Sequence, residues 1–65
     1  MPLNAQPNLT DPDGVYQMLT EAHRDLTAEA SAALNARLVL ILVNHIGDAA
    51  IIREALAAAS KIGPG

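Results

Sequence analysis

The stretch that decides the fold is LVLILV, residues 38–43, the longest apolar run in a chain of 65 residues. Helix-forming residues precede it without a break, and no turn residue follows until Gly47. This continuity predicts that the run belongs to a helix, with a strand as the alternative because several of its residues are β-branched. A helix that is apolar on all sides needs neighbours on more than one side. We therefore expect residues 28–46 to form the central helix of an all-α unit.

Two amphipathic segments flank the central helix. Asp11 and Pro12 are typical of a helix start, and the residues that follow predict a helix over about 12–25. Asp48 is placed to cap a third helix over about 49–61. The apolar stripe of the first helix consists of Val15, Met18, Leu19, Ala22 and Leu26. We expect a helical hairpin plus a third helix.

The sequence predicts an N-terminal arm followed by one domain. Residues 1–10 contain two prolines and two asparagines and predict an extended N-terminal arm. Residues 11–63 then form a single three-helix domain. A domain of this size buries a small core, and the chain has no cysteine to reinforce it. We therefore expect it to assemble into a homodimeric bundle or to bind a larger protein.

The charges exclude several classes of function. The net charge is −3, and the four basic residues are scattered. A nucleic-acid-binding protein needs a basic stripe, and an anionic membrane surface attracts one, so we expect neither partner. The longest apolar run has six residues, too few to span a membrane, and no secretory signal is visible. A cytoplasmic location is expected.

The sequence indicates neither a metal site nor a catalytic site. His23 and His45 are the only histidines, and a hairpin would place them about 20 Å apart, too far to share an ion. His45 and Asp48 could form a base with its orienting carboxylate, but no nucleophile or oxyanion donors accompany them. The simpler interpretation is that His45 favours the helix C-terminus and Asp48 is a cap. We expect no cofactor and no enzymatic activity.

Eight residues are candidates for binding a protein partner. Arg37 and Asn44 lie seven residues apart and form a polar line beside Leu40, which is either a solvated strip or an interface whose polar residues set the register. Tyr16 is the only aromatic residue, and it is either a boundary residue or an anchor. The predicted partner-binding set is Tyr16, Arg37, Leu38, Leu40, Ile41, Val43, Asn44 and His45.

The segments LNARL at 34–38 and NHIGD at 44–48, between two further helices, resemble a small bacterial family of unknown function. The resemblance covers roughly residues 10–60. Members of that family are often encoded near flavin-dependent aromatic hydroxylases, so the resemblance implies an accessory role beside an enzyme. It implies no catalytic residues.

Together these observations favour a non-catalytic helical interaction protein, an accessory or regulatory subunit of a cytoplasmic enzyme; the resemblance points to a catabolic one. The alternative is a homodimeric bundle that binds a small apolar ligand between its subunits.

Overall fold

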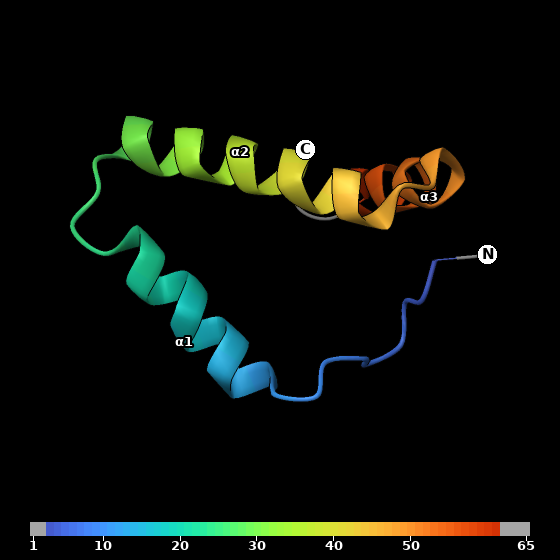
Figure 1. Cartoon of the computed structure of the whole chain (residues 1–65), viewed down its shortest axis with the longest axis horizontal. Coiled ribbons are helices and arrows are strands. Elements are labelled where there is room, and N and C mark those ends of the chain that lie inside the picture. Colours follow the sequence, from blue (N-terminus) through green and yellow to red (C-terminus); the bar gives the residue numbers. More distant parts are fainter. Residues whose placement is uncertain (1–2, 62–65) are drawn as a thin grey trace.

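The computed structural model describes residues 3–61 and confirms the all-α fold class (Figure 1). Three helices follow one another along the chain, and the described residues contain no strand. Helix α1 spans Pro12–His23, α2 spans Ala28–Ile46 and α3 spans Ala49–Ser60. The LVLILV run lies within α2, so its β-branched residues do not divert it into a strand.

Each helix begins at a side chain that caps its free backbone N–H groups. The Asp11 carboxylate accepts from the Gly14 N–H at 3.1 Å, and the Thr27 hydroxyl accepts from the Ala30 N–H at 3.1 Å. The Asp48 carboxylate accepts from the first turn of α3. Such caps satisfy the donors that a helix N-terminus leaves unpaired. The caps therefore fix where the three helices start.

Helix α1 ends two residues before the expected boundary at residue 25. Arg24 has extended backbone angles, and Asp25 has a left-handed φ of 61°. Aspartate tolerates this conformation better than most residues, although it is still strained there. The junction between α1 and α2 is therefore a four-residue turn, residues 24–27, rather than a continuation of the helix.

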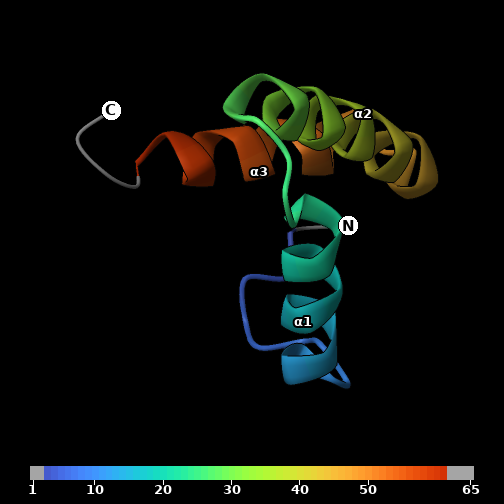
Figure 2. The same ribbon diagram turned by 90° about the vertical axis from the view of Figure 1, so that its left-hand side faces the viewer.

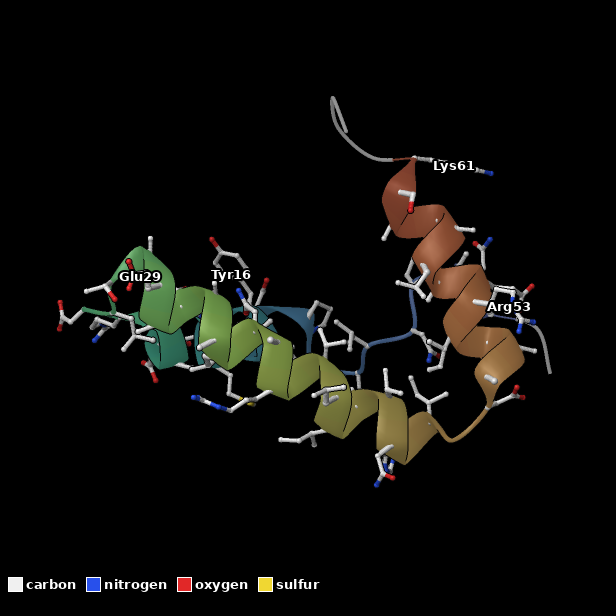
Figure 3. All side chains as sticks on the ribbon, turned by 90° about the horizontal axis from the view of Figure 1, so that it is seen from above. Tyr16, Glu29, Arg53 and Lys61 are labelled. Carbon is white, nitrogen blue, oxygen red and sulfur yellow. The ribbon has the colours of Figure 1, made fainter. Side chains whose placement is uncertain are left out.

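A tight turn at Gly47 joins α2 to α3. Gly47 has a φ of 69°, and its N–H donates to the Val43 carbonyl at 2.9 Å. Because only Gly47 separates the end of α2 from the Asp48 cap, the chain reverses sharply there. In the view of Figure 3, α2 and α3 form an elbow with this turn at its corner.

The first two helices do not form the closed hairpin that the sequence predicts. Figures 1 and 2 show that α1 and α2 meet at the turn and point away from each other on either side of it. The two helices therefore form an open V. A hydrogen-bonding contact between His23 and Asn35 joins them near the junction. The open V leaves the apolar side of α1 without α2 lying along it.

The arm before α1 is extended over its described part and runs back towards α3 (Figure 1). The Leu3 N–H donates to the Glu54 carboxylate of α3 at 3.1 Å. Residues 1 and 2 of the predicted arm and residues 62 and 63 of the predicted domain lie outside the described residues. An exposed hydrogen bond therefore joins the described start of the arm to the middle of α3.

None of the described residues is buried. The chain exposes 5783 Å², whereas a compact monomer of its mass exposes about 4,000 Å² by the usual scaling. Its radius of gyration is 13.4 Å, against about 10.7 Å for a compact domain of this length. Residues 3–61 of the isolated chain therefore form helices without enclosing a hydrophobic core among themselves.

The left-handed turn at Gly47 supplies a test of the α2–α3 elbow. A Cβ at this position would meet only the Asn44 carbonyl oxygen at an ordinary 3.7 Å, so the cost of Gly47→Ala comes from the backbone conformation. We expect this substitution to lower the free energy of unfolding by about 1 kcal/mol. Gly47→Asn should cost less, because asparagine tolerates the left-handed region. Urea unfolding followed by circular dichroism at fixed protein concentration measures both; equal stability of Gly47→Ala and the unsubstituted chain would contradict the elbow.

Candidate functional site

The main candidate site is an apolar groove inside the α2–α3 elbow, with a volume of about 380 Å³. All the residues that line it are apolar. Helix α2 contributes four of them and α3 the other four: Val39, Leu42, Val43 and Ile46, then Ile52, Ala55, Leu56 and Ala59. We call this the α2–α3 groove.

The spacing of these residues explains the groove. In each helix the lining positions follow the pattern i, i+3, i+4, i+7, which places four side chains on one face. The turn at Gly47 sets the two faces at an angle to one another (Figure 3). Leu56 is 64% exposed and Val39 is 56% exposed, so the facing rows do not close over each other. The groove is therefore open to a third apolar element.

Helix α1 carries the same pattern on a surface that is exposed except at the half-buried Val15. Val15, Met18, Leu19 and Ala22 again occupy positions i, i+3, i+4 and i+7, and we call them the α1 ridge. Met18 is 66% exposed and Leu19 is 42% exposed. The chain thus presents an apolar ridge and an apolar groove at the same time.

A second depression with polar residues adjoins the groove. Asn44, Asp48 and Arg53 line a second depression beside Gly47, which shares Val43, Ile52 and Leu56 with the groove. Asp48 uses its carboxylate to cap α3. An apolar surface with polar groups at its margin is typical of protein interfaces.

The eight predicted partner-binding residues lie on different sides of the structure. Leu40, which is 68% exposed, lies between Arg37 and Asn44 on one side of α2. Val43 lies in the α2–α3 groove. Leu38 is half-buried, and Ile41 and His45 are exposed on α2. The set therefore surrounds α2 instead of forming one patch.

Tyr16 lies apart from the other seven. It is 73% exposed on α1 and lines a shallow depression with Leu19, Thr20, His23, Arg24 and Asn35. Figure 3 shows its position relative to α2. The depression lies at the open V, so Tyr16 belongs to the α1–α2 junction rather than to the groove.

Sequence reasoning missed two features of the site. It did not bring Val39, Leu42 and Ile46 together with Ile52 and Leu56, although both rows repeat i, i+3, i+4, i+7 on either side of a one-residue turn. It also did not pair His23 with Asn35. No sequence signal links those two residues, because their contact depends on the angle of the open V.

The His23 ring joins α1 to α2 through two short contacts. Nδ1 lies 2.6 Å from the Leu19 carbonyl oxygen, one turn earlier in α1. Nε2 lies 2.7 Å from Oδ1 of Asn35 in α2. Both oxygens are acceptors, and only the protonated ring can donate from both nitrogens. The Leu19 carbonyl, and after it the Asn35 side chain, therefore raises the pKa of His23 above its ordinary value of 6.5.

Within residues 3–61, no group of three or more histidine, cysteine, aspartate or glutamate side chains is placed to hold a metal ion. Among the described helices, none combines the length and the apolar character that crossing a bilayer requires.

The comparisons assign the chain to a family but do not assign a function to it. The family model for "Protein of unknown function (DUF2783)" matches residues 3–61, which is most of the chain. The chain belongs to this family. No curated protein and no solved structure is similar enough to count as a match. The assignment to a family of unknown function agrees with the resemblance seen in the sequence, and the site has to be interpreted from its own geometry.

The raised pKa of His23 predicts that the α1–α2 junction depends on pH. Because protonation is favoured in the folded chain, its stabilising contribution is fully present below about pH 6.5 and is lost as pH rises through the raised value. An NMR titration of the His23 ring should therefore give a pKa above 6.5, and Asn35→Ala should lower it.

The matched control is Asn44→Ala, which removes an amide from the other end of α2. It should leave the titration of His23 unchanged. A pKa of His23 that does not respond to Asn35→Ala would contradict the junction contact.

Proposed function

We propose that this chain is a non-catalytic helical interaction protein, which acts as an accessory or regulatory subunit of an enzyme. One observation carries the proposal: none of the described residues is buried, while all three helices present apolar side chains. A small soluble monomer rarely leaves a large contiguous apolar surface exposed. The apolar faces are therefore a binding surface, and the bound protein supplies the missing side of the core.

The size of the exposed surface fits this role. The chain exposes roughly 1,800 Å² more than a compact monomer of its mass. A standard interface removes about 800 Å² from each partner. The excess is therefore large enough for one extensive interface or for two ordinary ones.

The side of α2 that carries Leu40 supports a second contact, separate from the groove. Leu40 is 68% exposed and has Arg37 and Asn44 as neighbours on the same side. An apolar anchor surrounded by polar groups is the usual composition of an interface centre and rim. In this proposal Leu40 supplies apolar contact, and Arg37, Asn44 and the separate Tyr16 supply specificity.

The proposal also names the class of enzyme that this chain would bind. The resemblance described above implies flavin-dependent aromatic hydroxylases and related catabolic enzymes as neighbours, so these are the first enzymes to test. A cytoplasmic enzyme is proposed, in keeping with the composition of the chain.

The α2–α3 groove favours one alternative. Its volume of about 380 Å³ lies at the lower end of the range for small-molecule sites, and its lining is apolar. A homodimeric bundle could bind a small apolar ligand there. In that case suitable ligands should raise the melting temperature of the protein by mass action, and a screen without such a shift would count against it.

The accessory role is tested by substituting the most exposed apolar residue of α2. Leu40→Asp should retain the helix content of the chain, because Leu40 makes few contacts within it, and should lose the partner enzyme. The measurement is co-purification of a tagged chain with a defined enzyme from cells that produce both, together with circular dichroism.

Ala57→Asp is the matched control, because it places the same charge at an exposed position of α3 outside the groove lining. It should retain both the fold and the enzyme. Retention of the enzyme by Leu40→Asp would remove Leu40 from the binding surface, and failure of the unsubstituted chain to hold any enzyme would contradict the accessory role.

A further inference from the structure

We propose that the α1 ridge of a second copy of this chain fills the α2–α3 groove, and that the two copies exchange α1 reciprocally. This inference rests on the proposed function in one respect: it takes the apolar faces to be protein-binding surfaces. It goes further because it names the protein that fills the groove, a second copy of this chain.

The ridge and the groove match in pattern and in length. The ridge repeats i, i+3, i+4, i+7 at Val15, Met18, Leu19 and Ala22, and each wall of the groove repeats the same spacing. Helices α1 and α3 each have 12 residues, which corresponds to about 18 Å. An amphipathic helix with this spacing of anchors is the usual occupant of an apolar groove. The α1 ridge, which spans residues 15–22, therefore equals in length the α3 wall of the groove, which spans residues 52–59.

The α1–α2 junction favours exchange over closure within one chain. Helix α1 diverges from α2 in the open V, so its ridge does not lie along its own groove (Figures 1 and 2). The turn has only four residues and includes the left-handed Asp25. Short, strained hinges are a common cause of exchange of an element between copies. The His23–Asn35 contact holds α1 in this open position.

The exposed area fits a dimer formed by exchange. Obligate homodimers bury about 2,000–5,000 Å² in total, or about 1,000–2,500 Å² per chain. The excess exposure of roughly 1,800 Å² per chain lies within this range. Two ridges in two grooves also form a closed two-fold assembly that leaves neither ridge nor groove free. A second copy thus satisfies both surfaces at once.

The charges of the chain disfavour the pairing of two α1 helices. Residues 11–25 carry four acidic groups and one basic group. Residues 48–61 carry two basic groups, Arg53 and Lys61, and two acidic groups, Asp48 and Glu54, so their net charge is zero. Two α1 helices would repel each other, whereas α1 meets no net repulsion from α3.

Disulfide trapping tests the exchange directly, because the chain has no cysteine of its own. One protein carries Met18→Cys and another carries Leu56→Cys, one in the ridge and one in the groove. On mixing and mild oxidation we expect a disulfide between the two chains. The control pair, Met18→Cys with Ala57→Cys, should form at least ten times less of it, because Ala57 lies outside the groove lining.

A chain that carries both Met18→Cys and Leu56→Cys distinguishes exchange from closure. Exchange predicts a covalent dimer on a non-reducing gel, whereas closure of α1 onto its own groove predicts a bridged monomer. The bridged monomer would overturn the proposal, as would equal trapping in the control pair.

Charge substitutions give a second, non-covalent readout. Met18→Asp disables the ridge and Leu56→Asp disables the groove, so each variant alone should be monomeric by light scattering at concentrations where the unsubstituted chain is a dimer. A mixture of the two variants should regain dimers, because one intact ridge still meets one intact groove. A mixture that remains monomeric would contradict a contact of ridge with groove.

Failure of this inference is distinguishable from failure of the proposed function. A purified chain that stays monomeric and still binds an apolar dye keeps its faces exposed, which overturns the second copy as occupant but leaves a different protein partner. A monomer that unfolds cooperatively and binds no dye has covered its own faces, which overturns both.

Discussion

The apolar surface of α2 is the constraint on which the rest of the structure depends. Residues 38–43 make this helix apolar on most of its sides, and one short helix on either side does not cover it. Helix α3 meets α2 across the Gly47 turn, while α1 diverges from it (Figure 1). Each chain therefore forms its helices locally, through side-chain caps, and leaves the hydrophobic contribution to stability incomplete. In the proposed assembly, binding of a partner completes the hydrophobic core, so binding and folding are linked.

The two connections between helices have opposite effects. Gly47 adopts a left-handed conformation without strain, so the α2–α3 elbow is a defined unit with an apolar groove. Asp25 adopts a similar conformation with strain, so the position of α1 depends on the exposed His23–Asn35 contact. In the proposed exchange, the elbow presents the groove and the α1 helix of a neighbouring chain fills it.

The fold class could be predicted from the sequence because its signals are local. Asp11, Thr27 and Asp48 start helices, and Gly47 ends one, through hydrogen bonds to residues two to four positions away. The angle between α1 and α2 could not be predicted, because it depends on Asp25 and on a contact 12 residues apart in sequence. The groove could be predicted only in part. The spacing of the lining residues is visible in the sequence. That the two rows face each other could not be predicted, because it depends on the geometry of the turn at Gly47.

The most direct test of this account is the solution mass of the purified chain by light scattering, with helix content measured by circular dichroism on the same dilution series. The account predicts a mass of two chains of 6.8 kDa each and a loss of helix content as dilution separates them. A mass of one chain at every concentration, with full helix content and a cooperative unfolding transition, would contradict it. That result would mean that the chain covers the apolar surface of α2 without a partner.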